Sequence, residues 1–214
     1  MRRIFISASA LIMAAALLSI LPVSMATAAN SSAAMEAYKA VLKNEMTFYS
    51  TDNKTHYKLC DFDYWSESDT YPLDVYQFTV VDMDNDGIPE VVLELTTGFD
   101  GSFEVLHYED GTVYGFNFVY RGMLSLSDDG MYLGSNGAYD SCILKASSIK
   151  DTYKEDVLAY SESGQDKNGN IIVSYYIGKS KVKEDQYNEL SQNVFNNPTL
   201  WHEFNDANID SVFK

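Results

Sequence analysis

The segment from residue 82 to residue 90 carries four acids in nine positions: Asp82, Asp84, Asp86 and Glu90, with Gly87 among them. Carboxylates this close repel one another, and each one raises the pKa of its neighbours. A hard divalent cation removes that cost, because Ca²⁺ takes about six to eight oxygen ligands from carboxylates and backbone carbonyls. The spacing of these acids therefore predicts a Ca²⁺-binding loop.

The alternate spacing would let a curling loop aim every second side chain at one ion. The predicted metal ligands are the side chains of Asp82, Asp84, Asp86 and Glu90 together with the main-chain carbonyl of Ile88. Gly87 would allow the sharp turn, because a residue without Cβ adopts conformations that other residues avoid. The alternative interpretation is an acidic surface turn that binds no metal.

The segment is not an EF-hand, which requires a glutamate at its twelfth position and a helix on each side. The twelfth position here is Leu93, and the flanking runs 76–81 and 91–95 are rich in β-branched and aromatic residues. Such runs are typical of strands. We therefore predict a strand–loop–strand hairpin.

At these residues the chain resembles the calcium loops of FG-GAP/VCBS-type repeats, whose pattern is D-x-D-x-D-G-x-x-D/E. It also resembles a loosely defined group of secreted bacterial proteins of unknown function that carry one such hairpin. The resemblance covers about twenty residues, 76–95, and includes Gly87 and all four acids. It implies calcium binding between two strands. Propellers of the repeat family need many such loops, and this sequence contains one.

The amino terminus has the pattern of a secretory signal peptide. Arg2 and Arg3 precede an apolar stretch from Ile4 to Val23, and small residues follow at 26–28. We expect cleavage after Ala28, export from the cell and no membrane span in residues 29–214; a retained membrane anchor is the alternative. Loss of residues 1–28 would change the formal net charge from −16 to −18.

This negative charge argues against nucleic acid as a partner, because phosphate binding requires a basic surface. It is compatible with a cation such as Ca²⁺ or with a basic partner, although solubility alone also explains it. Two cysteines, Cys60 and Cys142, remain after the leader. In an exported chain they could form a disulfide or stay as two thiols, and their spacing does not decide between these.

The predicted fold class is α+β, with residues 29–214 forming one domain. Apolar residues at steps of three and four predict a helix over 31–49 that packs on a sheet. The region 74–178 is predicted to be an antiparallel β-meander that contains the calcium-loop hairpin. Its turns are expected at 109–112, 128–130 and 167–170. The region 180–214 is predicted to form C-terminal helices packed on the sheet.

No catalytic motif emerges from the sequence. His56, His107 and His202 are scattered, no H-E-x-x-H segment is present, and no phosphate-binding glycine loop occurs. The stretch 61–67 interleaves acids with aromatic residues, including Trp65, and would suit either a surface loop or a platform for sugar rings.

We therefore expect a secreted, calcium-stabilised protein of a non-enzymatic type that acts by binding or surface interaction. Two alternatives stay open at this point. One is a secreted hydrolase, acting for example on glycans, in which calcium is structural. The other is a secreted inhibitor or accessory protein that docks on another protein.

Overall fold

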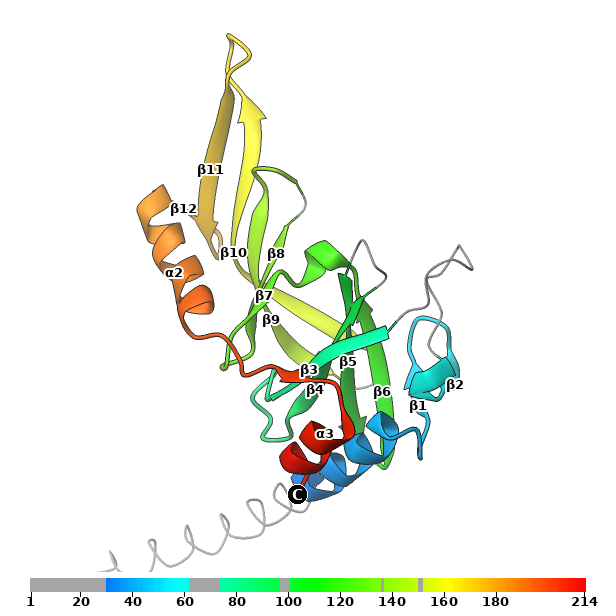
Figure 1. The fold of residues 1–214 in the computed structure, drawn as a ribbon. Helices are drawn as coiled ribbons and strands as arrows, with labels where there is room; N and C mark the ends of the chain where they lie inside the picture. Colours follow the sequence, from blue (N-terminus) through cyan, green and yellow to red (C-terminus); the bar gives the residue numbers. More distant parts are fainter. Residues whose placement is uncertain (1–29, 62–73, 97–100, 136, 150–151) are drawn as a thin grey trace, which may run out of the picture.

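The structure is a computed structural model that describes residues 30–61, 74–96, 101–135, 137–149 and 152–214. The predicted signal peptide, 1–28, and most of the acidic and aromatic stretch 61–67 lie outside these residues. Two β-sheets stacked on each other form the centre of the molecule, and helices cover their outer faces (Figure 1).

The first sheet, sheet A, holds seven strands in the order β13-β3-β4-β5-β6-β1-β2. Its strands are β1 (Phe48–Ser50), β2 (Thr55–Tyr57), β3 (Asp74–Val81), β4 (Glu90–Thr96), β5 (Gly101–Glu109), β6 (Thr112–Phe118) and β13 (His202–Glu203). Strands β3 to β6 form an antiparallel meander, whereas β1 pairs with β6 in the parallel direction.

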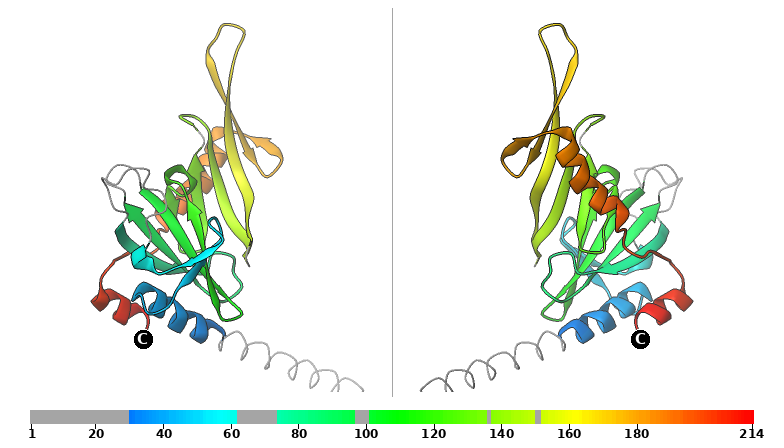
Figure 2. Two further views of the ribbon diagram at one scale, coloured as in Figure 1. Left: turned by 90° about the vertical axis from the view of Figure 1, so that its right-hand side faces the viewer. Right: turned by 90° about the vertical axis from the view of Figure 1, so that its left-hand side faces the viewer.

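The second sheet, sheet B, holds six strands in the order β12-β11-β10-β9-β8-β7, all antiparallel. Its strands are β7 (Ser125–Leu126), β8 (Met131–Ser135), β9 (Ser141–Ile149), β10 (Tyr153–Gln165), β11 (Ile171–Ile177) and β12 (Ser180–Val182). The ends of β10 and β11 extend beyond the other strands as a two-stranded arm that projects from the body (Figure 2).

Three α-helices flank the sheets in the described part of the chain: an N-terminal helix that includes residues 30–42, α2 (Glu184–Asn196) and α3 (Asp206–Val212). Two short 3₁₀ turns, η1 (Leu59–Asp61) and η2 (Tyr120–Gly122), join strands. None of these helices has the length and apolar composition that a membrane span requires.

The apolar core has three parts, one between each pair of neighbouring layers. The N-terminal helix and α3 bury Tyr38, Val41 and Ile209 against Leu93 and other residues of sheet A. A second cluster lies between the two sheets, and a third joins α2 to the far face of sheet B. The α+β class, the antiparallel meander with its loop hairpin and the packing of the C-terminal helices on the sheets are therefore confirmed.

The N-terminal helix ends earlier than the sequence predicted. It stops at residue 42 rather than 49, because Asn44 has a left-handed φ of 58°. The N–H groups of Glu45 and Met46 both donate to the carbonyl of Ala40, which closes the helix end. Phe48 and Tyr49, predicted as the end of the helix, instead belong to strand β1, which lies between β2 and β6.

Strands also occur outside the predicted β-rich region of 74–178. Strands β1 and β2 precede it, β12 follows the hairpin turn at Gly178, and β13 lies between α2 and α3. The chain therefore returns to sheet A near its carboxyl end, where β13 pairs with β3. In α2, Tyr187 and Val194 are buried, whereas Phe195 is 58% exposed.

Candidate metal centre

The acidic loop, residues 82–90, connects β3 to β4 at one end of sheet A. The two strands are antiparallel, and the register pairs Val81 with Glu90. Asn85 and Gly87 have left-handed φ values of 60° and 88°. Asparagine and glycine tolerate this conformation better than other residues, so the local sequence suits the turn that the loop makes.

The three aspartates accept backbone hydrogen bonds that curl the loop. Asp84 Oδ1 accepts from Asp86 N–H at 3.1 Å, and Asp86 Oδ1 accepts from Ile88 N–H at 2.7 Å. Asp82 Oδ2 accepts from Gly87 N–H at 3.0 Å. Each aspartate accepts these bonds through one oxygen. The second carboxylate oxygen of each side chain takes no part in ordering the loop backbone.

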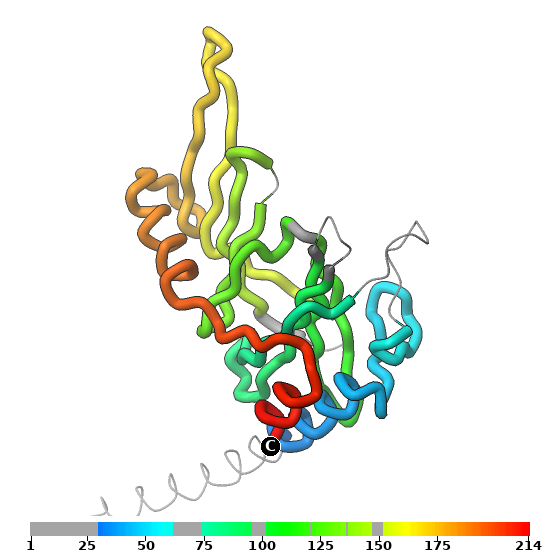
Figure 3. Tube along the Cα trace, viewed as in Figure 1, coloured from blue at the N-terminus to red at the C-terminus, as the bar shows by residue number. Residues whose placement is uncertain are grey.

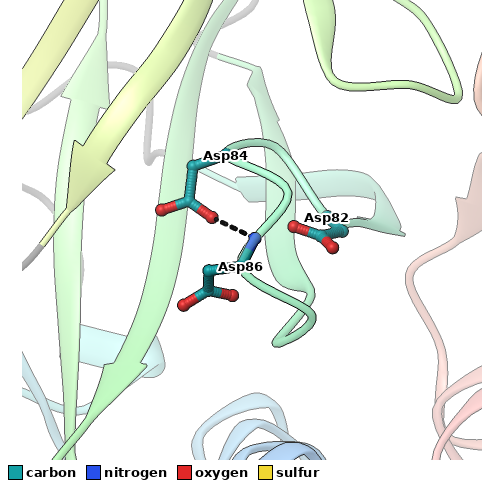
Figure 4. Close-up of side chains that lie close together, drawn as sticks. All are labelled: Asp82, Asp84 and Asp86. Atoms are coloured by element: carbon teal, nitrogen blue, oxygen red, sulfur yellow. Dashed lines mark hydrogen bonds between the residues drawn. The ribbon is translucent and has the colours of Figure 1, made fainter. Parts of the chain in front are cut away.

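The side chains of the three aspartates lie close together. Asp82, Asp84 and Asp86 each offer a carboxylate oxygen, and these oxygens lie within 4.8 Å of one another (Figure 4). Asp82 Oδ1 is buried and has no hydrogen-bond partner within the described residues. Burial and the neighbouring charge of Asp86 raise the pKa of Asp84. A cation among these oxygens would relieve both the repulsion and the unmet bond.

The structure places Glu90 apart from this group. Its side chain is completely buried at the start of β4. Glu90 Oε2 accepts from the Met83 N–H at 2.7 Å, and Glu90 Oε1 lies 2.9 Å from His107 Nδ1. Both carboxylate oxygens therefore contact protein groups, and they hold the loop to β5. The role of Glu90 as a metal ligand stays a prediction.

The Glu90–His107 pair is unusual because two ionisable groups share a buried site. Burial raises the pKa of Glu90 to about 7, although the bonds from His107 and Met83 act in the opposite direction. Burial lowers the pKa of His107, but the hydrogen bond with Glu90 and the negative charges of Glu90, Asp84 and Asp86 together outweigh burial, so the pKa is raised. The pair therefore retains a proton more readily than either group would in water.

Ile88, the fifth predicted ligand, anchors the loop by its side chain, which packs against the core between sheet A and the N-terminal helix. Its N–H is already bonded to Asp86. The proposed role of its carbonyl oxygen as a ligand stays a prediction.

Two neighbours of the loop were not foreseen from the sequence. His107 lies directly across from Glu90 because the register pairs Val91 with Leu106. Gly130, in the turn between β7 and β8, has a φ of 81°, and a Cβ there would lie 2.6 Å from Met83 Cα. Sheet B therefore rests directly on the acidic loop. The strand alternation could have indicated His107, but the contact with Gly130 depends on how the two sheets stack.

Other residues considered from the sequence do not gather into a site. Asp166 binds the backbone N–H groups of Asn168 and Asn170, so 166–170 forms the predicted hairpin turn. Cys60 and Cys142 are both free thiols. Within the described residues, Asp82, Asp84 and Asp86 are the acids, histidines or cysteines whose positions could hold a metal ion.

Comparison of the chain with protein families, with curated proteins and with solved structures finds no match. The fold and the site together define an α+β protein with two stacked sheets and a three-aspartate candidate metal centre.

Proposed function

We propose that the protein is a secreted, calcium-binding protein that calcium stabilises and that acts by binding rather than by catalysis. The observation that carries this proposal is the gathering of Asp82, Asp84 and Asp86, whose oxygens lie within 4.8 Å of one another. The buried and unbonded Asp82 Oδ1 adds to it, because a buried polar atom without a partner is costly.

The chemistry of the donors favours calcium over other metals. The group offers only carboxylate oxygens, which suit hard cations such as Ca²⁺ and Mg²⁺ rather than Zn²⁺ or Cu²⁺. Ca²⁺ accepts irregular oxygen cages with backbone carbonyls, whereas Mg²⁺ demands near-octahedral geometry and retains water. Three aspartates in a curled loop, with the Ile88 carbonyl as a further predicted ligand, fit the first description.

Calcium binding would stabilise the fold by mass action. A site with a Kd of ~10⁻⁵ M in millimolar calcium contributes ~2.7 kcal/mol to the free energy of unfolding. The effect would reach both sheets, because the loop joins β3 to β4 and contacts Gly130 of sheet B.

Export is supported by the leader pattern of residues 1–28 and by the resemblance of 76–95 to calcium loops of secreted bacterial proteins. Extracellular fluid commonly holds enough calcium to fill a site of this affinity. The leader pattern and the candidate calcium loop therefore both favour a location outside the cell.

Calcium titration by calorimetry tests the proposal. We expect one site in the purified protein, loss of binding in Asp84→Asn, and unchanged binding in Asp166→Asn. Asp166 is a matched control, because it also folds a turn through backbone N–H groups but has no second aspartate within its turn. A protein that binds no calcium at millimolar concentration would contradict the proposal.

A further inference from the structure

A second candidate site lies on sheet B, in a cleft of about 610 Å³ between η2 and β10. Sheet A covers the part of this face that carries Tyr132 and Ala146. The register pairs Leu144 with Val157 and Cys142 with Tyr160, so these four residues belong to the same face. Val157 is 52% exposed, which shows that sheet A leaves this end of the face open.

The walls of the cleft are fixed by close packing. A Cβ at Gly134 would lie 3.0 Å from Cys142 Sγ and 3.3 Å from the Gly122 carbonyl oxygen. The turn η2 therefore rests against β8 with no space for a further side chain. A site with rigid walls loses little entropy when it binds a ligand.

Glu155 is held in a defined position at one end of the cleft. It also lines a neighbouring cavity of about 350 Å³, as does Gly122, so the two cavities meet at these two residues. Its Oε1 accepts from the hydroxyl of Tyr132 at 2.5 Å and from that of Tyr153 at 3.4 Å. Tyr132 is completely buried. Both bonds go to Oε1, so the carboxylate is oriented while it stays exposed to solvent.

Arg121, in η2, also lines the cleft. It is exposed, and no hydrogen bond or ion pair engages it within the described residues. The sequence has three arginines, and the other two lie in the predicted leader. An arginine that no carboxylate of the described residues engages, in so acidic a protein, is available to bind a carboxylate of a ligand through two hydrogen bonds.

We propose that this cleft binds a short peptide with free ends. Arg121 would bind the terminal carboxylate, and Glu155 would bind the terminal ammonium. The apolar side chains of the peptide would cover Leu144, Val157 and Tyr160. Ser135 and Ser141 also line the cleft, but their hydroxyl groups bond within the protein, that of Ser135 to the Asp140 carbonyl and that of Ser141 to Ser161 and Tyr187.

The lining charges argue for a ligand with both signs of charge. Three acids, Asp140, Glu155 and Glu162, share the cleft with Arg121. A purely anionic ligand would be repelled by the acids, and a purely cationic ligand would leave Arg121 without a partner. The volume lies in the range of about 300 to 1,000 Å³ that is usual for small-ligand sites. The cleft belongs to sheet B and does not include the acidic loop, so the inference is independent of calcium.

Calorimetry with three related peptides tests the proposal: trileucine, N-acetyl-trileucine and trileucine amide. We expect trileucine to bind the purified protein and each blocked form to bind roughly tenfold more weakly, because each block removes one charge-assisted bond. Glu155→Gln should weaken trileucine roughly tenfold but leave the acetylated peptide unchanged. Arg121→Gln should weaken trileucine to a similar degree and leave the amide unchanged.

Asp156→Asn is the matched control. Asp156 is the next residue of β10, is exposed, and pairs with Lys154 rather than lining the cleft. The Asp156→Asn variant should bind all three peptides with the same affinities as the unaltered protein. Unchanged affinity of a variant for its matching blocked peptide also shows that the variant is folded.

Two results would overturn the proposal. One is the absence of binding by all three peptides at millimolar concentration. The other is binding that neither Glu155→Gln nor Arg121→Gln alters. Tight binding of a neutral trisaccharide such as cellotriose, with no dependence on Arg121, would assign the cleft to carbohydrate instead.

Discussion

Glu90 Oε1 lies 2.9 Å from His107 Nδ1, and both side chains are buried where β4 and β5 meet. The same carboxylate accepts the N–H of Met83, at the start of the acidic loop. Glu90 therefore connects the start of the acidic loop with β4, to which it belongs, and with the neighbouring strand β5. The last acid of the loop pattern acts as an anchor whether or not an ion is bound.

Glu90→Gln should lower stability even when calcium is absent. The glutamine amide has one accepting oxygen where the carboxylate has two, so it cannot replace both the oxygen that accepts from Met83 and the charged oxygen that contacts His107. We expect a loss of about 1 to 3 kcal/mol in the free energy of unfolding, measured with denaturant in the presence of a chelator. Asp84→Asn, in contrast, should unfold like the unaltered protein in chelator and differ from it only in calcium. Equal behaviour of the two variants in chelator would show that Glu90 is no anchor.

Gly130→Ala should be more damaging than Gly169→Ala, although both glycines have nearly the same φ, 81° and 84°. A residue with Cβ costs about 1 to 2 kcal/mol in this conformation at either position. At Gly130 the new Cβ would also lie 2.6 Å from Met83 Cα, whereas nothing lies within 4 Å at Gly169. We expect a further loss of about 1 to 3 kcal/mol for Gly130→Ala. Paired denaturant titrations would measure the difference.

Calcium binding provides a second measurement on the same pair. Because Gly130 contacts the backbone of Asp82 and Met83, Gly130→Ala should also weaken calcium binding. Gly169 is in the arm and should leave calcium affinity unchanged. Weakened calcium binding in both variants would mean that the contact between Gly130 and the acidic loop does not cause the loss of affinity.

Tyr38→Phe should cost about 1 to 2 kcal/mol of unfolding free energy. Tyr38 is completely buried in the N-terminal helix, and its hydroxyl oxygen accepts the N–H of Tyr108 at 2.8 Å. The substitution would leave that N–H without its partner. Tyr57→Phe is the control, because no hydrogen bond of the Tyr57 hydroxyl is present within the described residues. Thermal unfolding of the two variants should show the larger shift for Tyr38→Phe.

Acid should loosen α3 from the N-terminal helix. Lys39 and Lys43 lie 2.9 Å and 2.7 Å from Asp210 Oδ1, and they hold the pKa of Asp210 below its ordinary value. A carboxyl group whose pKa is lowered by folding contributes stability above its unfolded pKa and loses it as pH falls through the folded pKa. The stability of Asp210→Asn should therefore depend less on pH between about 5 and 2. Identical pH profiles would show that these ion pairs contribute nothing.

Local patterns in the sequence predicted the parts of this fold that depend on neighbouring residues. The gathering of Asp82, Asp84 and Asp86, the turn at 109–112 and the helix that begins the described chain were each predicted correctly, because each depends on residues a few positions apart. The end of the N-terminal helix was missed. Apolar residues continue past Asn44 into β1, and the left-handed turn that separates them has only one asparagine as its signal.

The remaining differences come from long-range pairing. Strand β1 lies parallel to β6, more than sixty residues later, and the meander is divided between two sheets. Spacing along the chain contains no signal for either feature. The same limit applies to Glu90, whose contact with His107 depends on the register of β4 and β5. The carboxylate pattern predicted where a metal could bind. The burial of Glu90, the last acid of that pattern, depends instead on the pairing of β4 with β5 in sheet A.

The salt bridges from Lys39 and Lys43 to Asp210 also have a topological consequence. They hold the N-terminal helix beside α3, so the first and last described helices of the chain lie together, at the end of the molecule remote from the arm (Figure 3). A short linker that joins these two helices would permit a circular permutation of the chain. The new termini would lie in the exposed turn 166–170. An anchor attached at the carboxyl end would leave the arm pointing away from the attached surface.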